Sequence, residues 1–272
     1  MSIEKSGMMA YVANAMGRAS DYSFLPPETF ARMVEALVDI DLAYMESSGA
    51  GEEGVYDETA VIVTADHGED LQEHNAPFEH REPYQTTVHV PLIFKAPAGM
   101  GLPRGTVQDA LVGHIDLMPS VLDLLGVHAP AGMDGSSWLP VLRGEAEELH
   151  EALFCTGGVC KDGEHWRTPE TAVCTPALKY IRRGNVTYRA EQPFRDYSSL
   201  CAPPWRAERP GDGRAYVDYF NALPRQELYV PAQDPGEQTN LAGHPAWAAQ
   251  MSELDARLTD WAASNPRRIV LA

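Results

Sequence analysis

A carboxylate and an imidazole directly follow an apolar run, and this arrangement is the clearest candidate for chemistry in the sequence. The run Thr59–Ala65 is followed by Asp66, His67 and Gly68. In open α/β sheets, ligands bind beyond the carboxyl ends of the strands. Gly68 would supply the backbone freedom for a turn that brings both side chains to one point. The pattern predicts a divalent-cation site at Asp66 and His67. The alternative is that Asp66 caps a helix beginning at Gly68 and His67 is an ordinary loop residue.

The residues after this point are rich in groups that bind metals and transfer protons. Four of the nine histidines fall in one short stretch, together with several acids: His67, His74, His80, His89, Glu69, Asp70, Glu73 and Glu79. Imidazoles and carboxylates are the ligands and proton carriers of hydrolytic sites, and a protonated imidazole can hold an anionic group. The alternative is a solvated acidic loop whose histidines make local hydrogen bonds, and we expect His89 to be structural.

The elements predicted around these residues follow an α/β order. Apolar residues at helical spacing predict a helix over 28–45, and the unbroken apolar run 59–65 is typical of a parallel strand buried on both faces. A second strand is expected over 88–95, at an edge or bulge because of Pro91. A helix is expected over 115–125, with Asp116 as its cap, Gly126 as its left-handed end, and a core face formed by Leu117, Val121, Leu124 and Leu125.

The pattern of residue types changes after the first half of the sequence, which predicts two regions, 1–150 and 151–272. Gly and Pro separate short β-prone runs at 178–182, 186–189 and 227–230, a pattern typical of an antiparallel subdomain. Trp247, Met251, Leu254, Leu258 and Trp261 are spaced as one face of a closing helix. The fold class expected is therefore an α/β core followed by a smaller antiparallel α+β subdomain.

Composition excludes several classes of function. The chain has 272 residues and a formal net charge of −18, an acidic surface that repels nucleic acid and anionic membranes. It contains no apolar stretch long enough to span a membrane, and its first residues do not form an export signal, so the expected location is cytoplasmic as the sequence stands. The cysteines are not spaced as a zinc ribbon, and no disulfide is predicted, although Cys155 and Cys160 could pair in an oxidising compartment: Cys155, Cys160, Cys174 and Cys201.

Several segments, in this order, resemble the sulfatase family of the alkaline phosphatase superfamily. The first is Thr64-Ala65-Asp66-His67-Gly68-Glu69 with Glu73-His74, His80, Tyr84 and 90–94, which is similar to the family's second metal-ligand segment. The others are 114–126, similar to the helix after that strand; 133–144, similar to the turn that follows it; and 227–229 with 234–242, similar to the C-terminal strand and turn. The resemblance implies an alkaline-phosphatase-like core over 1–150 and the family's C-terminal subdomain over 151–272.

The resemblance also implies a function and roles for individual residues. Asp66 would be a metal ligand, His67 a ligand or substrate contact, and His80 the contact to the anionic group of a small ester substrate. Family members hold one divalent metal, usually calcium, and cleave sulfate esters through a formylglycine. Many calcium sulfatases have Asn at the position of His67, and imidazole suits manganese or zinc better than calcium. Relatives that hydrolyse phosphonate esters or phosphodiesters, or transfer phosphoethanolamine, therefore remain alternatives.

The family's nucleophile segment, Cys or Ser followed by x-Pro-x-Arg, is not found before Asp66. Cys174-Thr175-Pro176 and Cys201-Ala202-Pro203 imitate it, but each lacks Arg in the required place and follows the metal strand instead of preceding it. We therefore expect the C-terminal portion of a sulfatase, with half of the site, weak metal affinity and negligible turnover alone. A missing N-terminal segment or a separate chain would complete the site. The alternative is a noncatalytic remnant or binding subunit.

Overall fold

The computed structural model describes residues 55–70, 73–74, 82–157, 160–162, 165–167, 170–184 and 221–264. The expected helix over 28–45, the expected strand over 186–189, His80 and Cys201 lie outside these residues. The chain divides into two compact units, residues 1–78 with 86–150 and residues 79–85 with 151–272. No helix in the described residues is long and apolar enough to cross a membrane.

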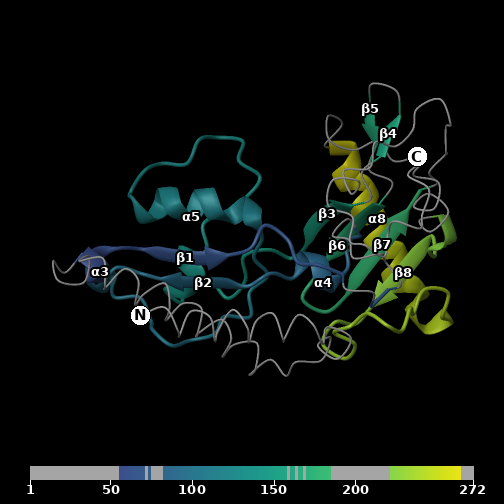
Figure 1. Cartoon of the computed structure of the whole chain (residues 1–272), viewed down its shortest axis with the longest axis horizontal. Coiled ribbons are helices and arrows are strands. Elements are labelled where there is room, and N and C mark those ends of the chain that lie inside the picture. Colours follow the sequence, from purple (N-terminus) through teal and green to yellow (C-terminus); the bar gives the residue numbers. More distant parts are fainter. Residues whose placement is uncertain are drawn as a thin grey trace, which may run out of the picture. The chain divides into compact units, whose positions relative to one another are not determined.

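The first unit contains a two-stranded sheet, with β1 (Val61–Thr64) beside β2 (Leu92–Lys95) (Figure 1). The strands pair antiparallel, with Val61 opposite Lys95 and Thr64 opposite Leu92. The prediction that this strand is parallel and buried on both faces was wrong, because β1 pairs antiparallel and is half-buried, with Thr64 exposed. A short apolar run indicates burial but does not specify the direction of the partner strand.

Short helical turns connect and flank these strands. Their bounds are α3 Val55–Glu58, α4 Gln85–Val88, η2 Ala98–Met100, η3 His114–Asp116, α5 Leu117–Leu124 and α6 Leu139–Leu142. The helix expected over 115–125 is confirmed as η3 followed by α5, and Gly126 closes it with a φ of +66°. Leu125 is 68% exposed, so its predicted place in the core was wrong.

Asp116 is the N-cap residue of α5, as predicted, but its side chain makes no capping hydrogen bond to that helix. Instead its buried carboxylate accepts hydrogen bonds from the Gly113 and Ser136 amides, each at 2.8 Å. The neighbouring segments over 114–126 and 133–144 are joined further by Ser120, whose hydroxyl accepts from the Trp138 amide at 3.0 Å. These polar contacts hold the two segments together in the first unit.

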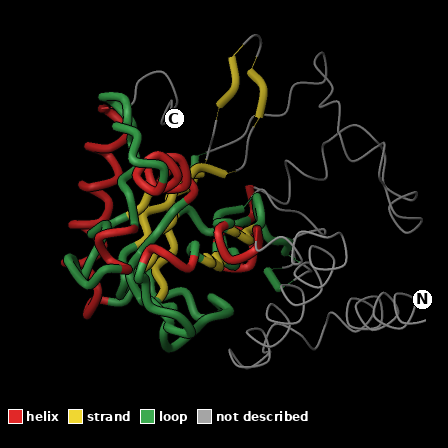
Figure 2. Tube along the Cα trace, turned by 90° about the vertical axis from the view of Figure 1, so that its left-hand side faces the viewer, coloured by secondary structure: helices red, strands yellow, loops and turns green. Residues whose placement is uncertain are grey.

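The second unit is an antiparallel sheet packed against a long helix, as the sequence predicted for this region. Strands β3 (Leu153–Gly157), β6 (Glu170–Cys174), β7 (Lys179–Arg183) and β8 (Gln226–Tyr229) lie in that order (Figure 1). A separate ribbon is formed by β4 (Cys160–Asp162) and β5 (His165–Arg167), which stands apart from the other strands in Figure 2. Cys155 and Cys174 are free thiols.

The closing helix α8 (Ala248–Ser264) follows the short turn η6 (Pro245–Trp247). Its buried Leu254 and Leu258 pack with Val173, Tyr180 and Leu228 of the sheet. Trp261 stacks on Phe154, with ring centroids 4.9 Å apart and the rings nearly parallel at 8°. The helix predicted from the apolar spacing is therefore confirmed, and it covers one face of the four-stranded sheet.

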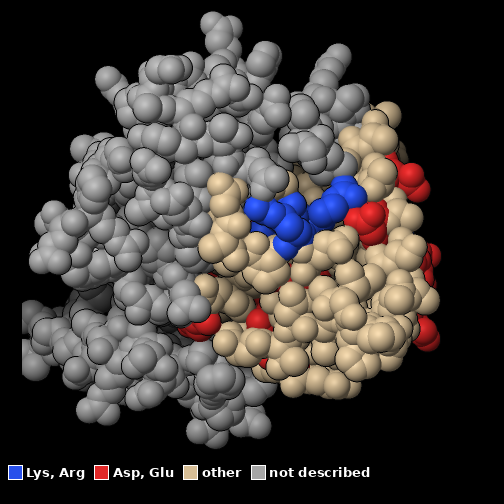
Figure 3. Space-filling model, turned by 90° about the vertical axis from the view of Figure 1, so that its right-hand side faces the viewer, with Lys and Arg blue, Asp and Glu red and all other residues tan. Residues whose placement is uncertain are grey.

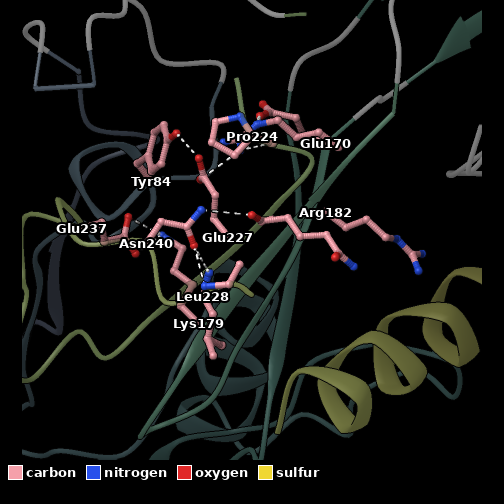
Figure 4. A network of polar contacts seen from close by, with 12 residues as sticks. Tyr84, Glu170, Lys179, Arg182, Pro224, Glu227, Leu228, Glu237 and Asn240 are labelled. Atoms are coloured by element: carbon pink, nitrogen blue, oxygen red, sulfur yellow. Dashed lines mark hydrogen bonds and ion pairs between the residues drawn. The ribbon is translucent and has the colours of Figure 1, made fainter. Parts of the chain in front are cut away.

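Charged side chains form a second, polar core in this unit (Figure 4). Arg183 is buried and contacts the carboxylates of Glu170 and Glu227, the latter at 2.9 Å. Tyr84 donates to Glu227 at 3.2 Å, and its ring centroid lies 5.3 Å from the Arg183 guanidinium. Lys179 pairs separately with buried Glu237 at 2.9 Å. Each of these three buried carboxyl groups, on Glu170, Glu227 and Glu237, thus contacts a buried cation.

Candidate metal-binding strand end

Asp66 and His67 lie just beyond the end of β1, where the sequence placed them. The Asp66 side chain is 88% exposed and that of His67 is 38% exposed. Nε2 of His67 lies 3.6 Å from Oδ2 of Asp66, and the His67 amide donates to Oδ1 of Asp66 at 3.0 Å. The two side chains therefore turn toward one another at an accessible point. Residues 68–70 are described and are not helical, so the alternative that Asp66 caps a helix beginning at Gly68 is wrong.

The orientation of the His67 ring is set by its neighbours. Nδ1 lies 3.0 Å from the Gly68 carbonyl oxygen, and 3.9 Å from a carboxylate oxygen of Glu69. A carbonyl oxygen can only accept, so Nδ1 carries the proton in this hydrogen bond. In the neutral ring Nε2 is then the nitrogen with the lone pair, which is the form that binds metals.

Gly68 is required for space and not for unusual backbone angles. Its φ is not positive, and the bend in the chain lies at Asp66. A Cβ at this position would lie 2.0 Å from the Thr86 carbonyl oxygen. The Gly68 amide donates to the Thr87 carbonyl at 2.8 Å. The chain after His67 is therefore pressed directly against the backbone of α4.

A second backbone contact lies just before Asp66. Nε2 of His114, in η3, lies 2.8 Å from the carbonyl oxygen of Ala65. Another histidine contacts the residue that anchors η3: Nε2 of His150 lies 2.8 Å from Oδ1 of the buried Asp116. Sequence reasoning nominated neither histidine. The sequence showed only that His114 is the first residue of the segment 114–126. It could not show the contact, because the partner is a backbone carbonyl 49 residues away.

The carboxylate of Asp66 and the imidazole of His67 are of the types that bind divalent ions, but two donors are too few to complete a metal site. Zinc bonds to nitrogen and oxygen are about 2.0–2.2 Å long, so two donors on one ion lie within about 4.2 Å of each other. The 3.6 Å separation of the Asp66 and His67 donors meets that condition. Within the described part of the chain, however, no group of three or more His, Cys, Asp or Glu side chains could hold a metal ion. These residues would supply part of a metal site.

Comparison with known proteins finds similarity to sulfatases. Residues 48–127 match the Sulfatase family model. The chain is 28% identical over 233 residues to the Delta 4,5-hexuronate-2-O-sulfatase of Bacteroides thetaiotaomicron, covering 85% of this chain and 39% of that protein. It is 30% identical over 223 residues to the multifunctional alkaline phosphatase superfamily protein PehA of Trinickia caryophylli, covering 80% of this chain and 37% of the relative.

A solved structure supports the same assignment. The structure of a 2-O GAG sulfatase matches with a TM-score of 0.54 and 25% identity, covering 79% of this chain and 39% of that one. The chain therefore spans about two fifths of the length of these proteins, and its α/β unit with the antiparallel subdomain corresponds to part of an alkaline-phosphatase-like fold. By sequence and by fold, the chain is similar to part of the sulfatases, which belong to the alkaline phosphatase superfamily.

Proposed function

We propose that the chain is part of a hydrolase that cleaves sulfuric esters at a divalent-metal site. In this proposal Asp66 and His67 are metal ligands, and His80 contacts the anionic group of a small ester substrate. The observation that supports it most directly is the pair of donor atoms on Asp66 and His67, 3.6 Å apart at the exposed end of β1. The sulfatase relatives supply the reaction class.

Two donors are fewer than any of the expected metals requires. Zinc takes four ligands and calcium six to eight. We propose that a further segment, or a separate chain, supplies the remaining donors together with the nucleophile. When bound, the metal would neutralise charge on the transferred group as a Lewis acid. The chain's own part is to present the Asp66 carboxylate and to keep the His67 ring oriented through its bond to Gly68.

The identity of the metal separates the main proposal from its alternative. Calcium prefers oxygen donors, whereas imidazole suits zinc and manganese. His67 therefore favours the second candidate, a metal-dependent phosphonate or phosphodiester hydrolase or a phosphoethanolamine transferase of the same superfamily. The similarity to a multifunctional alkaline phosphatase superfamily protein supports keeping it. Binding of calcium in preference to zinc and manganese would favour the sulfatase.

The metal site is tested by calorimetric titration of the purified chain with calcium, manganese and zinc. Asp66→Ala removes one of the two donors, and we expect it to lower the affinity roughly ten-fold or more. Asp109→Ala removes an exposed carboxylate elsewhere in the same unit and serves as the matched control. Equal affinities for the wild type, Asp66→Ala and Asp109→Ala would show that the ion binds the acidic surface and not this strand end.

Turnover of an aryl sulfate and an aryl phosphonate ester, with each metal, tests the half-site. We expect negligible turnover by this chain alone, and its appearance only with a chain that carries the Cys-x-Pro-x-Arg segment. Turnover by the chain alone that Asp66→Ala abolishes would contradict the half-site proposal. Metal binding without turnover in any mixture would favour the noncatalytic alternative.

A further inference from the structure

The backbone that presents Asp66 and His67 is held on both sides of the pair. After the pair, the Gly68 amide donates to the Thr87 carbonyl at 2.8 Å. Before it, the His114 ring lies 2.8 Å from the Ala65 carbonyl oxygen. The Ala65 carbonyl belongs to the same planar peptide unit as the Asp66 amide. A bond that fixes this oxygen therefore fixes the direction in which the chain enters Asp66.

The chemistry of the His114 contact defines the donor. A carbonyl oxygen has no proton, so the ring must donate the hydrogen on Nε2. At 2.8 Å between nitrogen and oxygen, the contact has the length of a well-formed hydrogen bond. The residue itself is exposed, so it is not placed there to fill an apolar core. The hydrogen bond is the contribution that this side chain makes to the strand end.

The element that carries His114 is rigidly anchored. Asp116, two residues on, is fully buried and accepts from the Gly113 amide, the Ser136 amide and His150, each at 2.8 Å. Close backbone packing adds to this, because a Cβ on Gly135 would lie 1.9 Å from the Ile115 carbonyl oxygen. The turn η3 thus has little room to shift, and His114 extends from a fixed base.

We propose that His114 is a positioning residue for the Asp66–His67 pair. By holding the Ala65 carbonyl, it fixes the Ala65–Asp66 peptide so that the two donor atoms lie within reach of one ion. The metal-binding consequence rests on the function proposed above for Asp66 and His67. Residues behind the ligands commonly change metal affinity 10–100-fold when they are removed. A residue that merely joins η3 to β1 would alter stability without altering that affinity.

The test compares His114→Ala, His114→Gln and the wild type, with His128→Ala as the control for losing an exposed histidine of the same unit. Glutamine carries an N–H donor at the end of a side chain of similar reach, so it can replace the bond to Ala65. We expect His114→Ala to speed amide hydrogen exchange at Asp66 and His67 in the metal-free chain. We also expect it to lower manganese or zinc affinity about ten-fold or more, whereas His114→Gln and His128→Ala stay near the wild type.

The two measurements separate this proposal from the one on which it rests. If the wild type binds no metal, the proposed function fails, and hydrogen exchange still decides whether His114 holds the strand end. Unchanged exchange in His114→Ala would overturn the positioning role whatever the metal result. If the wild type binds metal, an affinity of His114→Ala within two-fold of the wild type would also overturn it, as would failure of His114→Gln to restore the affinity.

Discussion

At the scale of single residues, Gly68 is the position where the strand end tolerates least change. An alanine methyl group would lie 2.0 Å from the Thr86 carbonyl oxygen, which is backbone and cannot swing away as a side chain can. Moving that backbone would disturb the 2.8 Å bond from the Gly68 amide to Thr87. The presence of a glycine directly after the Asp-His pair is explained by this close approach.

We therefore expect Gly68→Ala to lower the free energy of unfolding by about 1–3 kcal/mol, the usual cost of forcing atoms into a packed region. Gly99→Ala is the control, because a Cβ there meets nothing within 4 Å and its φ is not positive. That change should be neutral or stabilising by about 0.4–1 kcal/mol. Urea unfolding measures both. Equal stability of the two variants would contradict the packing explanation.

At the scale of elements, the spacing of apolar residues along the sequence predicted the helix and the strands whose formation depends on that spacing. The spacing of Trp247, Met251, Leu254, Leu258 and Trp261 identified α8, and the β-prone runs at 178–182 and 227–230 are confirmed as β7 and β8. The direction of the β1 partner was predicted wrongly, because pairing depends on residues about thirty positions away. The strand end at Asp66 and His67 was located from sequence, but His114 was not, since its partner is a distant backbone carbonyl.

The packing of α8 yields a quantitative prediction at this scale. Leu258 is fully buried against Val173, Tyr180 and Leu228, so Leu258→Ala leaves a cavity in the second unit. We expect a loss of about 2–5 kcal/mol in the free energy of unfolding, measured by urea denaturation and followed by tryptophan fluorescence. Ser252→Ala, on the exposed side of the same helix, should change it by less than about 0.5 kcal/mol. A small loss for Leu258→Ala would mean that α8 does not depend on this contact.

At the scale of the whole molecule, the candidate site accounts for little of the net charge of −18. Asp66 and Glu69 account for only two of the 39 acids. On the face shown in Figure 3, the Lys and Arg side chains gather in one group with an acidic side chain beside them. Such pairing occurs between Arg182 and Asp255 at 2.9 Å. Exposed pairs contribute little to stability, so pH dependence should come from the buried carboxylates.

One such group of buried carboxyls includes Glu170 and Glu227, both labelled in Figure 4, and the guanidinium of Arg183. Two carboxylates, Glu170 and Glu227, contact this one guanidinium, so full ionisation would leave excess negative charge in the core. Burial raises the pKa of Glu170 to about 8, and Arg183 offsets only part of that rise. In an unfolded chain the pKa of Glu is about 4.3. Between these two values the folded chain retains a proton that the unfolded chain loses.

Stability should therefore fall as pH rises from about 4.5 to about 8, with a slope of up to about 1.4 kcal/mol per pH unit from this group. Glu170→Gln mimics the protonated carboxyl and has no proton to lose. We expect its free energy of unfolding to increase relative to the wild type as pH rises through that window. Urea unfolding at several pH values measures the difference, and Glu253→Gln, on an exposed site of α8, should run parallel to the wild type. Parallel curves for Glu170→Gln as well would show that Glu170 is ionised in the folded core and that Arg183, not a bound proton, compensates it.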